Sequence, residues 1–360
     1  MRVLLCGGGS AGHVNPALAI AETILKNAPK SKVAYVCTVS GIENDLVHMK
    51  KYHIDVSGIN KHSLTKNIKS VFLAIKAIKK SKEIIQDFSP DVVIGTGGYA
   101  TFPVISAAKK LKIKTVLHES NAFPGRTIKL LESKADLILT NFLDSEKYFK
   151  DKSKIECVGN PVREKFLSSN REVAKEKIKQ RYVILCCGGS LGAEKINEAA
   201  IDIVENFIRY RPDVKLILST GKKSYYDVCE TVRKKRLDKL ENFSVLEYIH
   251  DMANKMAMAD IVISRAGATT ISELATMQKC SILIPSPNVA NNHQYKNAKA
   301  LEEDGAAIVI TEDRLYTLTD VAKDLIGDRE KRKSMERKIK SFYNPDANQK
   351  IYESIMNLVE

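Results

Sequence analysis

The feature that most constrains the fold is a repeated pattern, an apolar strand-like run that ends in glycines. Residues 3–12 (VLLCGGGSAG) align with residues 183–192 (VILCCGGSLG), at an offset of 180 residues. A second pair follows in the same order, residues 91–94 (DVVI) before Gly98 and residues 260–263 (DIVI) before Gly267. This interval is too long for a solenoid repeat and suits a whole domain. We therefore expect two similar domains.

Short apolar runs alternate with helical patterns along the whole chain. The expected strands are 3–6, 32–37, 92–95, 115–118, 182–187, 214–219, 261–264 and 282–285, and the clearest helices are 16–26, 68–88 and 193–207. This alternation predicts an α/β fold of two Rossmann-like, doubly wound domains with parallel sheets. We place the first domain at 1–162, the second at 163–342, and a last helix at about 343–360 that could pack on either domain. The ligand is expected in a cleft between the domains, at the carboxyl ends of both sheets.

The composition is that of a globular enzyme with an anionic partner. The 57 Lys and Arg residues against 43 Asp and Glu residues give a net charge of +14. No apolar run approaches the ~20 residues of a membrane span, and the N-terminus resembles no signal peptide, so a cytosolic protein is expected. The seven cysteines form no Cys-x-x-Cys motif. Reduced core thiols are therefore favoured over a zinc site or a disulfide framework.

One segment gathers basic charge without any acid. Between Asp55 and Glu83, lysines alternate with apolar residues at helical spacing, and the residues that would face a membrane are Ile68, Lys69, Phe72, Ile75, Lys76, Lys79 and Lys80. The pattern fits an interfacial helix on anionic lipid, and equally an ordinary helix that covers a sheet with a solvated lysine face. Because no aromatic residues are interleaved at stacking positions, a nucleic-acid partner is disfavoured.

The first glycine loop has the spacing Gly7-x-Gly9-x-x-Gly12, which formally matches a dinucleotide fingerprint. The acid that such a site needs after the second strand is missing, since that strand ends in Thr38-Val39-Ser40, so no nicotinamide or flavin cofactor is expected. Exposed N–H groups at the start of the following helix would still favour an anion. His13 lies in this loop, either as a proton acceptor or as a residue that caps the loop by hydrogen bonding.

Other polar residues follow strand ends, where ligands bind in such folds. Glu119 and Asn121 could face a ligand or satisfy local backbone groups. The second glycine loop, 188–193, offers N–H groups and the Ser190 hydroxyl to a phosphate, and Arg163 could pair with the same group. Glu273, one turn into a helix, could accept both hydroxyls of a ribose or merely complement the helix dipole.

Taken together, these motifs resemble those of the MurG family of bacterial glycosyltransferases, from Gly7 to about Ala300. The matching motifs, in chain order, are GGGSAGH with NPALA (7–19), TGGY (96–99), HESNAFPG (118–125), GNPVR (159–163), GGSLGA (188–193), RAGATTISE (265–273) and NNHQYKNA (291–298).

The resemblance implies a GT-B fold and an inverting transfer of N-acetylglucosamine from UDP-GlcNAc to the MurNAc C4 hydroxyl of lipid I. Lipid I is undecaprenyl-pyrophosphoryl-MurNAc-pentapeptide, and the products are UDP and lipid II of peptidoglycan synthesis. No metal or other cofactor is implied, and the enzyme would be peripheral on the cytoplasmic face of the membrane. His13 is the matched candidate base. The matched UDP-GlcNAc contacts are Ser10, Ala11, Gly12, Asn121, Arg163, Ser190, Ile249, Ala268, Thr269, Thr270, Ile271, Ser272, Glu273 and Gln294.

Among these contacts, the resemblance implies that the Ile249 backbone binds the uracil and that Glu273 binds the ribose. It also implies that Ser190 binds the phosphates and Gln294 the sugar hydroxyls. The sequence departs from the family where Ser10-Ala11 replaces Thr-Gly and where Ser120 replaces Gln. The alternatives are a related UDP-sugar transferase acting on diacylglycerol, a UDP-sugar epimerase on the same scaffold, and, from charge alone, a nucleic-acid-binding protein.

Overall fold

The computed structural model describes residues 1–56, 64–176, 178–189, 192–289 and 292–360, with the side chains of 64–71 left undescribed. The chain forms two compact units. Unit 1 comprises Met1–Glu164 and Asn344–Glu360, and unit 2 comprises Lys165–Tyr343. The chain first passes from unit 1 to unit 2 after Glu164, two residues beyond the boundary expected at 162. The last helix belongs to unit 1.

Unit 1 contains a parallel sheet with the strand order β3-β2-β1-β4-β5-β6-β7. Its strands in the described residues are β1 (Arg2–Cys6), β2 (Lys32–Thr38), β3 (Lys50–Ile54), β4 (Val92–Gly95), β5 (Lys114–Glu119), β6 (Leu137–Thr140) and β7 (Ile155–Cys157). The order reverses between β1 and β4, so the loops after these two strands lie at the switch point where such sheets bind ligands.

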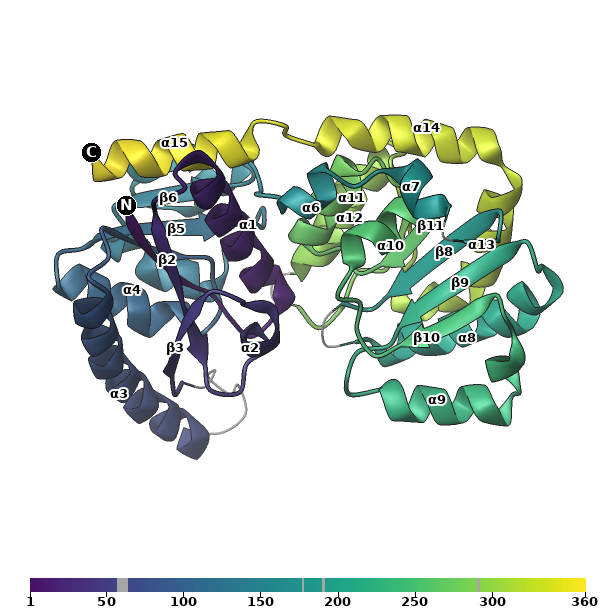
Figure 1. The fold of residues 1–360 in the computed structure, drawn as a ribbon, viewed down its shortest axis with the longest axis horizontal. Helices are drawn as coiled ribbons and strands as arrows, with labels where there is room; N and C mark the ends of the chain where they lie inside the picture. The colour runs from purple at the N-terminus through teal and green to yellow at the C-terminus, as the bar shows by residue number, and fades with distance from the viewer. Residues whose placement is uncertain (57–63, 177, 190–191, 290–291) are drawn as a thin grey trace. The chain divides into compact units, whose positions relative to one another are not determined.

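Helices cover both faces of this sheet. They are α1 (Ala11–Asn27), α2 (Glu43–Leu46), α3 (Leu64–Phe88), α4 (Thr101–Lys110), α5 (Arg126–Leu131) and α15 (Ala347–Val359). Alternate strand residues point to opposite faces, so Val3 and Leu5 pack with α1 and α15, whereas Leu4 packs with α3, α4 and α5. Figure 1 shows α15 beside α1. Ile351 and Ile355 of α15 are buried in that core.

Unit 2 repeats this design with the strand order β10-β9-β8-β11-β12-β13, again all parallel. Its described strands are β8 (Tyr182–Cys187), β9 (Val214–Ser219), β10 (Phe243–Leu246), β11 (Ile261–Ser264), β12 (Ser281–Leu283) and β13 (Ile308–Val309). Glycines follow the central strand β8 as they follow β1, which is the structural counterpart of the sequence repeat.

Helix α6 (Glu164–Leu167) spans the boundary between the units, and the helices after it surround the second sheet. They are α7 (Arg171–Lys175), α8 (Glu194–Asn206), α9 (Tyr225–Lys234), α10 (Met252–Met258), α11 (Ala268–Thr276), α12 (His293–Glu303), α13 (Leu318–Gly327) and α14 (Arg329–Ile339). Apolar side chains of α8, α9 and α13 form one core with the strands. Helix α10 packs against β8, with Met256 and Met258 buried. The prediction of two α/β domains with parallel sheets is confirmed.

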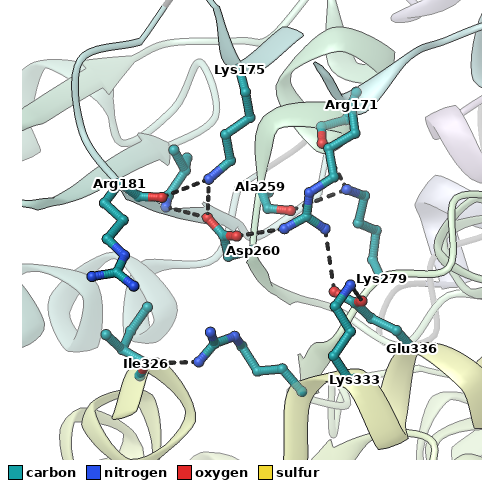
Figure 2. Close-up of polar contacts among 12 residues, drawn as sticks. Arg171, Lys175, Arg181, Ala259, Asp260, Lys279, Ile326, Lys333 and Glu336 are labelled. Carbon is teal, nitrogen blue, oxygen red and sulfur yellow. Dashed lines mark hydrogen bonds and ion pairs between the residues drawn. The ribbon is translucent and has the colours of Figure 1, made fainter. Parts of the chain in front are cut away.

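A cluster of charged side chains around the buried Asp260 holds α7 and α14 to the amino ends of the strands in the second sheet (Figure 2). Asp260, which precedes β11, pairs with Arg171 and Lys175, each at 2.6 Å. Arg171 also contacts Glu336 of α14 at 3.3 Å. The amine of Lys279 donates to the Ala257 and Ala259 carbonyls, and burial lowers its pKa to about 7. These contacts lie at the end of the sheet opposite the glycine loop, so they stabilise unit 2 away from the expected site.

Candidate active site

The first glycine loop, between β1 and α1, packs against the loop that follows β4. Gly97 and Gly98 adopt φ of +104° and +78°, and a side-chain carbon at Gly98 would lie 2.0 Å from the Gly8 carbonyl oxygen. Gly8 N donates to Gly97 O at 3.3 Å. The glycines at 97 and 98 are therefore required for the two loops to approach this closely.

His13 lies where these loops meet, in the first turn of α1. Its Nδ1 is 3.1 Å from Gly8 O and 3.3 Å from Ser10 Oγ, and its carbonyl accepts a 2.6 Å hydrogen bond from Thr96 Oγ1. A carbonyl oxygen can only accept, so the Gly8 contact places the proton on Nδ1 and the lone pair on Nε2. A side-chain carbon at Gly97 would lie 2.7 Å from the imidazole Cδ2. The imidazole thus contacts the loop and also has the tautomer that a general base needs.

The segment after β5 is organised by Glu119, which is buried. Its carboxylate accepts hydrogen bonds from Asn121 N, Asn121 Nδ2 and Gly125 N, at 2.8, 2.9 and 2.7 Å. Burial raises the pKa of Glu119, and these hydrogen bonds oppose that rise. Of the two interpretations offered by the sequence, Glu119 satisfies local backbone and orients Asn121, which is half-buried at the loop surface.

His118, on β5, faces the interior. It is fully buried, Nε2 lies 3.3 Å from Gly159 O, and Nδ1 has no hydrogen-bond partner in the described residues. Burial lowers the pKa of His118 from 6.5 to about 4. Because the folded protein disfavours the imidazolium, His118 couples the stability of unit 1 to pH.

We expect the protein to lose stability as the pH falls from 6.5 towards 4. In this window the unfolded chain binds a proton at His118 that the folded chain does not bind, which costs up to about 3 kcal/mol of unfolding free energy. Urea unfolding at pH 7, 5.5 and 4.5 measures the effect. His118→Gln should weaken the pH dependence, and His48→Gln, at an exposed histidine, should leave it unchanged. Equal pH dependence in wild type and His118→Gln would contradict this assignment.

Arg163 lies in unit 1 and is already paired. Its Nε and Nη2 contact Glu22 Oε1 of α1 at 2.8 and 2.6 Å. Glu22 Oε2 also accepts from Glu164 N at 3.0 Å. A guanidinium has five N–H donors, so a contact between Arg163 and a phosphate would use the donors that Glu22 leaves over or would replace the Glu22 carboxylate.

In unit 2, the loops that follow β8 and β9 lie against each other. A side-chain carbon at Gly192, which has φ of +79°, would lie 2.2 Å from Thr220 O. Ser190, the expected phosphate ligand, lies outside the described residues. Gly188, Gly189 and Gly192 still define a strand–loop–helix connection of the kind that binds anions through backbone N–H groups.

The other expected donor contacts lie on segments that follow strands of unit 2. Glu273 is buried on α11, and its charge adds to the burial that raises the pKa of Cys187, at the end of β8, to about 12. Ile249, after β10, is also buried, so that only its backbone could meet a base. Gln294 Oε1 accepts from Ser286 N at 2.9 Å, which orients its amide. Helix α11 also carries the remaining expected contacts, Ala268, Thr269, Thr270, Ile271 and Ser272.

Two family models match the chain in the order of its units. The N-terminal domain of glycosyltransferase family 28 matches residues 3–140, and the C-terminal domain of the same family matches residues 183–351. A transferase of Acetivibrio thermocellus is 40% identical over 370 residues, covering 100% of this chain and 99% of the relative. The chain belongs to glycosyltransferase family 28. It is therefore an enzyme that transfers sugars.

The relatives within family 28 share one description. The proteins of A. thermocellus and of Caldanaerobacter subterraneus, the latter 40% identical over 99% of this chain and 100% of its own length, are both described as UDP-N-acetylglucosamine--N-acetylmuramyl-(pentapeptide) pyrophosphoryl-undecaprenol N-acetylglucosamine transferase. The crystal structure of MurG from Acinetobacter baumannii is similar, with a TM-score of 0.71, 27% identity and 99% of both chains covered. The expected GT-B fold and the resemblance to MurG are confirmed.

Solved structures of another enzyme class share this fold at low identity. The UDP-GlcNAc 2-epimerase of Neisseria meningitidis has a TM-score of 0.68 at 17% identity, over 99% of this chain and all of its own. At that identity the likeness concerns the fold alone. The match to both domains of family 28 separates this chain from the epimerase alternative.

The family 28 motifs do not include every residue that shapes the first loop. Glu43 lies buried against Gly8, and no motif pointed to it because it is a single acid on a short helix 35 residues further along the chain. Similarly, Arg265 of the RAGATTISE motif pairs with Glu312 at 2.6 Å.

In the described part of the chain, no helix combines the length and hydrophobicity needed to cross a bilayer.

Proposed function

We propose that the protein transfers N-acetylglucosamine from UDP-GlcNAc to the C4 hydroxyl of MurNAc in lipid I, yielding UDP and lipid II, with inversion at the sugar C1. The observation that carries this proposal is the full-length similarity to relatives described with that activity. The alternative of a diacylglycerol acceptor is not favoured, because those relatives match this chain through the acceptor half as well as the donor half.

In the proposed mechanism, unit 1 binds the acceptor and His13 removes its proton. The C4 hydroxyl becomes more nucleophilic as Nε2 accepts its proton, and Nδ1 keeps its own proton through the contact with Gly8 O. General-base catalysis of this kind typically accelerates a reaction by roughly 10²–10⁴-fold. Thr96, which bonds the His13 carbonyl, holds the residue in place.

Unit 2 would bind the donor and stabilise the departing UDP. Backbone N–H groups after β8 would compensate the negative charge that develops on the diphosphate, with Ser190 and Arg163 as further proposed contacts. Glu273 would hold the ribose hydroxyls, and Gln294 the sugar. Ser10, Ala11, Gly12 and Asn121 complete the proposed donor contacts from unit 1.

A direct assay tests the proposed reaction. Purified protein is incubated with labelled UDP-GlcNAc and a short-chain lipid I analogue, and the β-linked disaccharide product is sought. A diacylglycerol acceptor in a parallel reaction tests the alternative. Formation of 2-epimerised UDP-sugar without any acceptor, or transfer to diacylglycerol alone, would contradict the proposal.

Glu273→Ala is expected to weaken UDP binding by roughly 1.5–3 kcal/mol, because hydrogen bonds between a carboxylate and the ribose would be lost. Isothermal titration calorimetry with UDP measures this. Glu230→Ala, at an exposed acid on α9, is the control and should bind UDP normally. Thermal unfolding checks that loss of the buried Glu273 leaves unit 2 folded. Normal UDP affinity in folded Glu273→Ala would remove Glu273 from the ribose site.

We also propose that the enzyme is peripheral on the cytoplasmic membrane face and attaches through α3. The second half of this helix buries Ile84, Ile85 and Phe88, as a cover helix should. The first half differs, since Phe72 is 77% exposed and Ile75 is 62% exposed. An interfacial helix requires such exposed apolar side chains, because they are the ones that would insert among lipid headgroups.

Lysines lie on the same part of α3. Lys76, Lys79 and Lys80 are exposed, and Lys80 contacts Glu83 at 3.0 Å at the surface. The side chains of Ile68 and Lys69, which belong to the same expected face, lie outside the described residues. Apolar residues ringed by lysines combine insertion with attraction to anionic headgroups. This arrangement favours the interfacial interpretation over the solvated cover.

A further inference from the structure

Glu43 is a fully buried acid beside the first glycine loop. Its Oε1 accepts hydrogen bonds from Thr38 N at 2.9 Å and from Thr38 Oγ1 at 2.6 Å. Its Oε2 has no hydrogen-bond partner within the described residues. Because the effective dielectric of a protein interior is low, an ionised carboxylate in such a place acts strongly on its neighbours.

The carboxylate lies beside Gly8. A side-chain carbon at Gly8 would lie 2.9 Å from Glu43 Oε1, and one at Gly41 would lie 2.1 Å from the same atom. Two glycines thus make room for the carboxylate directly behind the loop. The carbonyl of Gly8, in turn, contacts His13 Nδ1. The acid therefore lies beside the residue whose carbonyl the imidazole contacts.

We propose that Glu43 is a positioning residue for the reaction: across Gly8, its charge stabilises the imidazolium that forms when His13 accepts the acceptor's proton. A nearby carboxylate favours the charged form of an imidazole and makes it a stronger base. Glu43 also fixes Gly8 in the place where its carbonyl selects the Nδ1–H tautomer. This inference rests on the proposed role of His13 as general base.

Several other titratable groups face the carboxylate and the loop. They are Cys6 on β1, Tyr35 and Cys37 on β2, Lys51 on β3 and Tyr99 after β4. Burial raises the pKa of Cys6 and of Cys37 to about 12 and that of Tyr35 well above 10, so these groups are uncharged near neutral pH. The Lys51 amine is directed to Asn44 O, at 3.0 Å, on the exposed side of β3. Within this set, Glu43 is the carboxylic acid, and the proposed role requires its ionised form.

The test compares how kcat depends on pH in Glu43→Gln and in wild type. Glutamine keeps an oxygen that can accept from Thr38 but removes the charge. The acidic limb of the profile, where the base becomes protonated, should move to lower pH by about one unit. Asp45→Asn, an exposed acid on the same helix, makes the same change of charge and should leave the limb in place. Acid unfolding of a less stable variant would move the limb to higher pH, the opposite direction, so a stability loss does not imitate the effect.

Glu43→Asp provides a second variant in case Glu43→Gln does not fold. It keeps the charge but draws the carboxylate away from Gly8, so the limb should move in the same direction by less. An unmoved limb in whichever variant folds would overturn the inference and leave Glu43 as a packing residue. Normal turnover in His13→Ala would instead remove the base assignment on which the inference rests, so the two failures are distinguishable.

Discussion

His13→Ala is expected to lower kcat by ~10²-fold or more while leaving the affinity for UDP-GlcNAc nearly unchanged, because loss of a general base costs about this much. The imidazole contacts Gly8 and Ser10 within its own loop in unit 1, whereas most proposed donor contacts lie in unit 2. Steady-state kinetics with a soluble acceptor and calorimetry with the donor separate the two effects.

Two variants control this experiment. His13→Gln offers an amide in place of Nδ1–H for Gly8 O but cannot accept the proton, so it should be as inactive as His13→Ala. His48→Ala, at an exposed histidine of the same unit, should be fully active. If donor binding falls in His13→Ala while bound donor turns over normally, His13 is a loop-capping or binding residue and the base lies elsewhere.

Charge reversal on α3 is expected to release the protein from membranes. Each lysine near an anionic surface contributes about 1 kcal/mol, so replacing Lys69, Lys76, Lys79 and Lys80 with glutamate should abolish flotation with anionic vesicles. Turnover of a detergent-soluble acceptor should be largely kept, and salt should weaken attachment of the wild-type protein.

A matched variant carries the same change of charge elsewhere. Lys234, Lys239, Lys331 and Lys340 are exposed lysines of unit 2, and their replacement by glutamate should leave flotation near the wild-type level. Should the α3 variant still float at the wild-type fraction, the membrane face lies elsewhere and α3 only covers the sheet.

The sequence predicted the central strands of unit 2 because they are mostly apolar and a glycine follows each within three residues. Residues 182–187, 214–219 and 261–264 were expected as strands and are β8, β9 and β11. The edge strand β3 was not predicted from the sequence, since its residues, KKYHI, are mostly exposed and polar. An edge strand buries little, so its pattern carries little signal.

The site was only partly predictable for a related reason. Motif residues lie on loops that follow strands, and the topology brings such loops together wherever the sheet is parallel. Pairs of side chains from distant parts of the sequence have no motif that predicts them. The ion pair of Arg163 with Glu22, for example, joins residues 141 positions apart. The position of Glu43 beside Gly8 likewise depends on how the loop after β2 folds back, which neither spacing nor composition encodes.

The return of α15 to unit 1 has a consequence for the order of folding during synthesis. Asn344 and Asn348 bond Val158 O and the Val162 backbone, and Ile351 and Ile355 fill the core beside α1. Unit 2 is thus an insertion within unit 1. On the ribosome, all of unit 2 emerges before the residues that complete the earlier unit, so the second Rossmann-like unit can finish folding first. Until α15 arrives, the half-built first unit has an uncovered apolar face, which is the stage at which a chaperone would have most to protect.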